Sequence, residues 1–351
     1  MLKHAKLSVL QVCKSTGILH AVENSSWRRN KLLILCYHGI ALEDENQWDR
    51  SLFMTSDLLR HRLQMLQDHR CNVLPLDEGI RRLYARDLPE RSVAITFDDG
   101  TYDFYARAWP VLREFGYPVT VYLTTYYSDF NRPVFDVMCS YMLWKARGNG
   151  RLEWPEVLPQ PAALDEAGRI AAVQAIKDFA LERKLSGAEK DTLLADLAGR
   201  LGIDYEALCR KRILHIMTPE ESRQLASEGV DIQLHTHRHR VWKRKEKFFR
   251  ELDDNRQRIQ AISPVTPRHF CYTGGFYLFE FFGYLEEYGI VSATTCEDGL
   301  CDESSRRMQL PRLVDTSTLT DLEFEGWLSG VSALLPSRRY VPASGQLGRE
   351  D

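Results

Sequence analysis

The chain has 351 residues, of which 44% are hydrophobic and 27% are charged, so it can bury a sizeable core. This composition excludes a disordered chain, a collagen and a fibre. Lys and Arg number 46 against 49 Asp and Glu, which gives a net charge of -3. A dedicated nucleic-acid-binding protein would show a basic excess, so we expect no nucleic-acid partner.

Residues 1–30 predict an N-terminal amphipathic segment, because Leu7, Leu10 and Cys13 recur at helical spacing. Such a helix can lie on a membrane surface or pack on the domain. The longest apolar run is residues 32–37, six residues against the roughly 18 that a bilayer span needs, and no secretory signal is evident. We expect a cytoplasmic protein with reduced cysteines, and peripheral contact with the inner membrane face as a further option.

Short β-branched and apolar runs alternate with helical patterns along the chain, which predicts βα units and a mostly parallel sheet. The runs are residues 32–37, 72–76, 93–97, 119–123, 230–234, 270–272, 290–294 and 310–314. The strand pattern stops between 131 and 217, where stretches such as 165–184 and 188–201 predict a helical insertion. Residues 336–351 are rich in Ser, Gly, Pro and Arg and predict a flexible tail.

Polar residues follow two of these strands, at the edge where parallel α/β folds build their sites. Asp98 and Asp99 follow the run 93–97 and precede Gly100. They are consistent with a turn, but two adjacent carboxylates repel each other and are stabilised by a cation.

A histidine-rich segment follows the run 230–234. His235 and His239 are separated by four positions, so one helical turn can direct them at a common point, and His237 would then point elsewhere. Imidazoles and a carboxylate form a site for a divalent ion, most often Zn²⁺, with one position open for water. The alternative is a polar loop with incidental histidines.

The two segments together resemble the polysaccharide deacetylases of carbohydrate esterase family 4, the NodB-homology domain. The resemblance covers about residues 31–315 and rests on Thr-Phe-Asp-Asp-Gly and His-Thr-x-x-His at strand ends. It implies a distorted (β/α) barrel of seven or eight strands with a helical insertion, within a domain that we place at 31–335. It also implies that Asp98 is the general base and that Asp99, His235 and His239 hold the metal.

The sequence departs from the family pattern after the run 270–272. Cys271 stands where the family usually has Arg, although the Tyr272 backbone N–H could still face an oxyanion. Arg312 follows another strand and could supply the missing charge, the alternative being a surface ion pair.

A second departure concerns the general acid. Many family members carry a histidine near the C-terminus, whereas this chain has none after His269. His38, in a Tyr-His pair on the first strand, resembles the arrangement of permuted members. We therefore predict that His38 is the general acid, because its ordinary pKa suits proton donation near neutral pH.

These residues predict a metal-dependent hydrolase that removes an N-acetyl group from an amino sugar, in a polysaccharide or in a lipid- or nucleotide-linked glycan precursor. The alternatives are a deformylase or other amide hydrolase on the same scaffold, and a catalytically silent carbohydrate-binding protein of a polysaccharide assembly system. A basic stretch with interleaved aromatic residues could contact an anionic carrier or a membrane, or simply be the solvated start of a helix. It comprises Arg238, Arg240, Lys243, Arg244, Lys245 and Lys247, with Trp242, Phe248 and Phe249.

Overall fold

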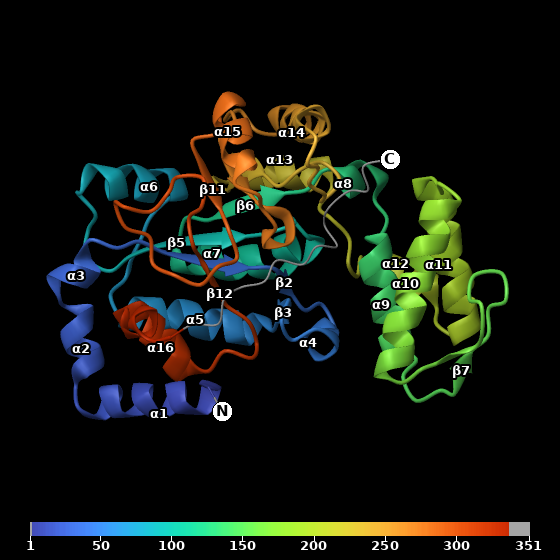
Figure 1. The fold of residues 1–351 in the computed structure, drawn as a ribbon, viewed down its shortest axis with the longest axis horizontal. Helices are drawn as coiled ribbons and strands as arrows, with labels where there is room; N and C mark the ends of the chain where they lie inside the picture. The colour runs from blue at the N-terminus through green and yellow to red at the C-terminus, as the bar shows by residue number, and fades with distance from the viewer. Residues whose placement is uncertain (1, 337–351) are drawn as a thin grey trace.

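The computed structural model describes residues 2–336 and centres on a parallel sheet that curls into a distorted barrel (Figure 1). Seven strands follow the order β11-β10-β9-β6-β5-β1-β12, and β4 pairs with β5 as the eighth. The strands are β1 (Leu33–Tyr37), β4 (Asn72–Val73), β5 (Ser92–Phe97), β6 (Thr120–Leu123), β9 (Asp231–Leu234), β10 (His269–Cys271), β11 (Ser292–Thr294) and β12 (Leu313–Val314). Each predicted run overlaps one of them, so the predicted barrel of seven or eight strands is confirmed.

The two ends of the curled sheet meet at the segment that leads into β12. Leu310 forms a parallel bridge with Thr294 of β11, and three residues later Leu313 pairs with Leu35 of β1. The carboxyl ends of all these parallel strands therefore face the same mouth of the barrel.

The side chains of β5 show how the barrel is filled. Successive side chains of a strand point to opposite faces. The large core beneath the surrounding helices therefore contains Val93, Ile95 and Phe97. The other face carries Ala94, which belongs to a smaller inner cluster, and Thr96, which bonds to a buried arginine. The inner cluster also contains three residues of α6, so apolar packing fills this interior below the polar mouth. Helix α6 (Leu76–Ala85) packs on this inner cluster. The main outer helices are α5 (Ser56–Asp68), α7 (Trp109–Phe115), α13 (Pro219–Ser227), α14 (Lys245–Gln260), α15 (Glu280–Glu287) and α16 (Asp321–Ser329).

The segment predicted as a helical insertion lies beside one end of the barrel (Figure 1). Its helices are α9 (Phe135–Lys145), α10 (Glu166–Glu182), α11 (Gly187–Leu201) and α12 (Tyr205–Arg210). The expectation that strands are missing here is wrong, because β7 (Arg151–Leu152) and β8 (Ala162–Ala163) form an antiparallel pair. Strands of two residues are too short to show a hydrophobic alternation. The helices share their own hydrophobic cluster, which includes Ile176 and Leu197 and is separate from the core of the barrel.

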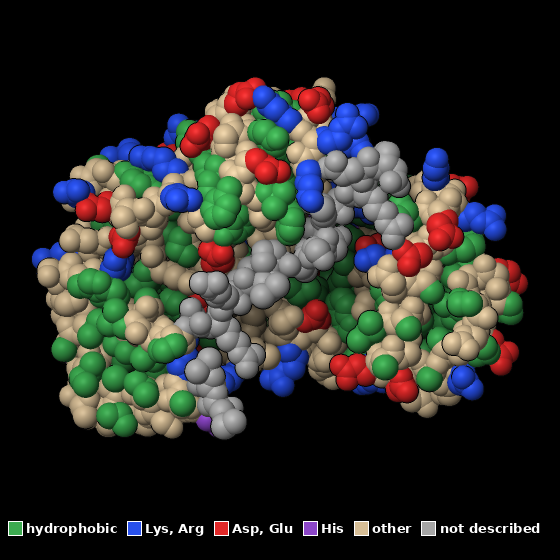
Figure 2. Space-filling view, in the orientation of Figure 1, with side chains coloured by type: hydrophobic (Ala, Val, Ile, Leu, Met, Phe, Trp, Pro, Cys, Tyr) green, Lys and Arg blue, Asp and Glu red, His purple; other side chains and the backbone are tan. Residues whose placement is uncertain are grey.

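The N-terminal segment forms α1 (Leu2–Ser15), α2 (Ile18–Glu23) and α3 (Ser26–Arg29). Leu10 is fully buried and packs with Leu19 and Val331, so α1 packs on the domain. Val9 and Val12 remain 44% and 57% exposed, and Figure 2 shows hydrophobic side chains gathered over the end where α1, α2 and α16 lie.

Two further expectations concern the chain as a whole. Within residues 2–336 no helix has the length and apolar character needed to cross a bilayer. All eight cysteines are free, as predicted. Residues 337–351 of the predicted tail lie outside the described part of the chain.

Candidate active site

The two adjacent carboxylates follow β5 and face different surroundings. The side chain of Asp98 is 2% exposed inside the barrel mouth, whereas that of Asp99 is 29% exposed. Asp99 adopts a left-handed backbone with φ 70°, and Gly100 follows with φ 73°. A Cβ at Gly100 would lie 2.2 Å from Leu123 Cδ1 of β6, and the positive φ of Gly100 favours glycine there.

Asp99, His235 and His239 come together at the mouth. Asp99 Oδ1 lies 3.2 Å from His235 Nε2 and 3.1 Å from His239 Nε2. Burial raises the pKa of Asp99, but the two imidazoles outweigh burial and hold the pKa well below its usual range. His239 has φ 55° and the intervening Thr236 has φ 61°, so non-glycine residues in the left-handed region cluster here, as they do at functional sites.

The chemistry of this group fits a divalent metal ion. One carboxylate and two imidazoles are the donor set of catalytic zinc sites that leave a position open, and their ligand atoms lie within 4.8 Å of one another. His237 points away, as predicted, because its Nδ1 lies 2.8 Å from Thr125 Oγ1. The site therefore uses two of the three histidines of this segment.

A buried polar network holds the histidine segment in place. Asn255 of α14 accepts a hydrogen bond from the His235 backbone N–H through Oδ1 at 3.0 Å and donates to Thr125 Oγ1 at 3.0 Å. His235 Nδ1 lies 2.8 Å from the Cys271 carbonyl oxygen, which leaves Nε2 facing Asp99. The sequence analysis missed Asn255, because a single asparagine within a helical pattern carries no signal of its own.

Asp98 forms a two-pronged ion pair with Arg312, and both side chains are buried. Arg312 Nη1 donates to Asp98 Oδ1 at 2.7 Å, and Nη2 donates to Oδ2 at 2.7 Å. Burial raises the pKa of Asp98, but the guanidinium outweighs burial and holds the pKa well below its usual range. Of the two readings of Arg312, the geometry excludes the surface ion pair.

Two thiols also contact Asp98. Cys271 Sγ lies 3.3 Å and Cys36 Sγ 3.5 Å from Asp98 Oδ2. Burial raises the pKa of both thiols, so they are protonated donors to the carboxylate at neutral pH. Cys271 Sγ also accepts from Arg312 Nη2 at 3.1 Å, so the small side chain at position 271 leaves room for an arginine that arrives from another strand.

His38 reaches the mouth of the barrel, whereas the Tyr272 backbone N–H is used in sheet pairing. His38 follows β1, its Nε2 lies 3.8 Å from Asp98 Oδ2, and its side chain is 19% exposed, so it reaches the mouth. The proposed oxyanion donor at Tyr272 is not free, because its backbone N–H donates to the Thr294 carbonyl at 3.2 Å. The expectation for Tyr272 is therefore corrected: the pairing with β11 continues one residue past the end of β10 and uses this N–H.

The basic stretch is partly neutralised within the protein. Arg238 Nη1 donates to Glu251 and Asp254 at 2.9 Å each, and Lys245 pairs with Glu287. Phe248 is fully buried in the core, so it offers no surface to a sugar ring. Lys245 begins α14, which matches the alternative of a helix start.

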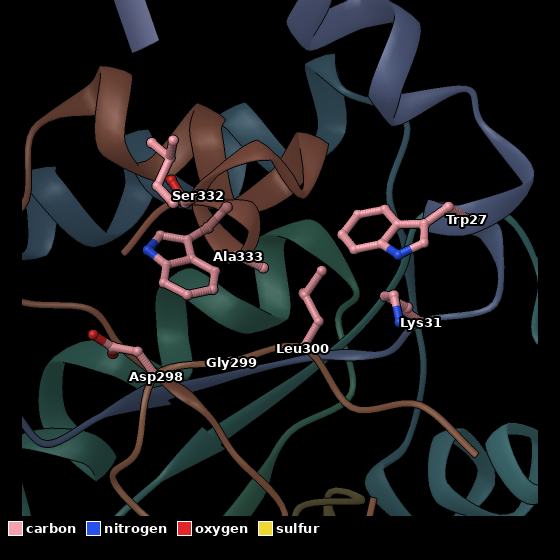
Figure 3. Close-up of a pocket in the computed structure, with 9 residues that line it drawn as sticks. Trp27, Lys31, Asp298, Gly299, Leu300, Ser332 and Ala333 are labelled. Carbon is pink, nitrogen blue, oxygen red and sulfur yellow. The ribbon is translucent and has the colours of Figure 1, made fainter. Parts of the chain in front are cut away.

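One cavity lies away from these residues. It has a volume of about 240 Å³, and Figure 3 shows Trp27 and Lys31 on one side of it and Asp298 on the other. Lys31 precedes β1 whereas His38 follows it, so the cavity is at the opposite end of that strand from the candidate site.

Comparison with known proteins supports the same family. The profile of the family described as "Polysaccharide deacetylase" matches residues 85–149 and 190–293. Poly-beta-1,6-N-acetyl-D-glucosamine N-deacetylase of Escherichia coli (strain K12) is 30% identical over 26% of this chain and 14% of the relative. The protein of the same name from Staphylococcus epidermidis is 28% identical over 34% of this chain and 47% of the relative. The matches thus span less than half of these curated relatives.

Solved structures show the same fold at low sequence identity. The deacetylase PplD of Streptococcus pyogenes, solved with acetate, has a TM-score of 0.56 at 15% identity, covering 87% of this chain and 99% of that one. IcaB from Ammonifex degensii has a TM-score of 0.53 at 14% identity, covering 85% and 97%. The sequence profile matches two segments of the chain and the solved structures share its barrel, so the chain is similar to polysaccharide deacetylases.

Proposed function

We propose that this chain removes N-acetyl groups from the amino sugars of an N-acetylated polysaccharide. The observation that carries the proposal is the convergence of Asp99, His235 and His239 beside the buried pair of Asp98 and Arg312. Two curated relatives are named for poly-β-1,6-N-acetyl-D-glucosamine, so a β-1,6-linked N-acetylglucosamine polymer is the first candidate substrate.

In the proposed reaction, Asp99, His235 and His239 hold a divalent ion, for which we propose Zn²⁺. When bound, such an ion supplies Lewis acidity, which polarises an amide carbonyl and acidifies a water molecule. Asp98 is kept ionised by Arg312 and accepts the proton of the attacking water. His38, whose Nε2 faces Asp98 Oδ2, donates a proton to the departing amine as the C–N bond breaks.

The test measures acetate released from β-1,6-linked N-acetylglucosamine oligomers by the metal-reconstituted protein. We expect release that stops when a chelator removes the ion and returns when the ion is restored, and no release by Asp99→Asn. Stoichiometric metal without acetate release would reject the proposal. An N-formylated oligomer run in parallel distinguishes the deformylase alternative by the formate it would yield.

The carrier of the substrate and the cellular compartment of the protein remain predictions. A lipid-linked or nucleotide-linked substrate would use the cations of the basic stretch, two of which the protein already pairs with its own carboxylates. We propose a polymer as the first candidate for that reason. Substrate arms with free, nucleotide-linked and lipid-linked sugars, and fractionation of cells for cytoplasmic or inner-membrane location, would separate these options.

A further inference from the structure

We propose that Cys36, His38 and Asp98 form a second cation site, selective for thiophilic divalent ions, whose occupation inhibits the enzyme. The residues come from the ends of β1 and β5 and are distinct from the three ligands described above. Their ligand atoms lie within 4.8 Å of one another. The inhibitory effect rests on the proposed function, whereas ion binding does not.

The separations fit a tetrahedral ion. With bonds of about 2.0 to 2.3 Å, two ligand atoms of a tetrahedral zinc-type site lie about 3.3 to 3.8 Å apart. Asp98 Oδ2 lies 3.5 Å from Cys36 Sγ and 3.8 Å from His38 Nε2. These atoms therefore need only small movements to share one ion, and water can complete the coordination.

The donor types determine which ions the site takes. Sulfur, imidazole nitrogen and carboxylate oxygen together favour Zn²⁺ or Cd²⁺ over Mg²⁺ or Ca²⁺. When the ion binds, the Cys36 S–H bond breaks, its proton leaves to solvent and a sulfur–metal bond forms. The thiolate adds a negative charge to that of the Asp98 carboxylate, which then faces both the ion and Arg312. Arg312 and the Cys271 thiol both donate to Asp98 Oδ2, so the ion would take the lone pair of the weaker thiol donor, whose S–H can turn to the Tyr272 carbonyl at 3.7 Å.

A competing group of Asp98, His235 and Cys271 is also compact. His235, however, has both ring nitrogens engaged, Nε2 at Asp99 and Nδ1 at the Cys271 carbonyl. All three members of that group are buried, whereas the His38 side chain is 19% exposed and gives an ion access from solvent. Entry from solvent and a free imidazole nitrogen favour the group that contains Cys36.

Occupation of this site would take both proton-handling residues out of the reaction. In the proposed mechanism Asp98 accepts a proton and His38 donates one, and the second ion would bind the same two side chains. We therefore expect the first equivalent of zinc to support acetate release and an excess to suppress it at least tenfold.

The binding experiment titrates the metal-depleted full chain with Cd²⁺ in the absence of substrate. We expect two bound ions per chain, and an ultraviolet absorption band from thiolate-to-cadmium charge transfer that grows as the second ion binds. Cys36→Ser should bind one ion without the band, and Cys139→Ser, a matched change of a thiol buried in the insertion, should keep both. Cys271→Ser should also keep both.

Two results would overturn the proposal: one ion and no band in the unmodified protein, or a band lost in Cys271→Ser and kept in Cys36→Ser. Cadmium NMR of the unmodified protein needs no variant and should show a second resonance with a sulfur-ligated shift. If acetate release is absent while the second ion and its band appear, the proposed function fails and the site stands. If release occurs with one ion and no band, the site fails alone. The activity of Cys36→Ser is compared with one equivalent of zinc and with an excess. The excess should not inhibit this variant.

Discussion

Asp98 and Asp99 are neighbours in the chain, yet they belong to two different regions of the mouth. The region around Asp98 is buried and closed by a guanidinium and two thiols, whereas the region around Asp99 is more exposed and lined by imidazoles. Successive side chains at the end of a strand point to different sides, so one dipeptide can serve both regions. The difference shows that the partners of a carboxylate, rather than its place in the sequence, determine what it can do.

Asp103 extends this comparison. Its side chain is buried much as that of Asp98 is, but Oδ1 accepts from the Ile40 backbone N–H at 2.9 Å and from Thr101 Oγ1 at 3.0 Å. Burial raises the pKa of Asp103 to about 7, whereas the arginine beside Asp98 lowers that of Asp98. The pKa values of two similarly buried carboxylates are therefore shifted in opposite directions, because Asp98 has a cation at hydrogen-bonding distance and Asp103 has neutral donors.

The largest expected effect comes from removing a proposed metal ligand in the open region around Asp99. His239→Gln should lose the ion and reduce acetate release to background, because one of three ligands is removed. His237→Gln is the matched control in the same segment and should keep both. The checks are metal content per chain and acetate release, and an active His239→Gln protein that retains its ion would contradict the assignment.

Asp98→Asn breaks the closed region and should separate chemistry from metal binding. We expect metal content to stay stoichiometric while kcat falls by about 10² to 10⁴, the contribution of a general base. Metal analysis and kcat on the same oligomer test this. Loss of the ion in Asp98→Asn would instead place Asp98 among the metal ligands.

Arg312→Met tests what the guanidinium does for Asp98. It leaves a buried carboxylate without its partner, so the free energy of unfolding should fall by about 3–5 kcal/mol. Turnover should fall by about 10- to 100-fold, less than in Asp98→Asn, because the base is misplaced rather than removed. Denaturant unfolding of Arg312→Met, Asp98→Asn and the double variant measures their coupling. Additive losses would show that the pair does not act as a unit.

The smallest effect concerns stability and pH. The folded pKa of Asp103, about 7, is above the unfolded value of about 3.9. Between about pH 4 and pH 7 the folded state therefore keeps a proton on Asp103 that the unfolded state has lost. The contribution of this proton to the free energy of unfolding is fully present below about pH 4 and is lost as the pH rises to about 7. Asp103→Asn should remove this decline, which is about 4 kcal/mol at most. Unfolding free energies of the two proteins, measured from pH 4 to 8, should agree at pH 4 and diverge as the pH rises, because the amide stays neutral; parallel curves would contradict the assignment. Asp129→Asn, an exposed carboxylate on α8 (Tyr126–Phe130), is the control.

Much of the fold was predictable because short-range patterns report it. Hydrophobic runs located all eight barrel strands, and the Thr218, Pro219 and Glu221 pattern corresponds to a capping box at the start of α13. The pair β7 and β8 was missed because two residues cannot show a period. The free N–H expected at Tyr272 was wrong because sheet pairing, which consumes it, depends on a partner strand that local sequence does not identify.

The sequence by itself determined which chemistry is present: two carboxylates after one strand and two histidines one turn apart after another, in an alternating βα chain. Only the tertiary structure decided which carboxylate meets which cation. Arg312 reaches Asp98 across 214 positions, and Cys36, Cys271 and Asn255 meet the site from three further elements. Such contacts depend on the curvature that closes the sheet, which no spacing within a single segment encodes.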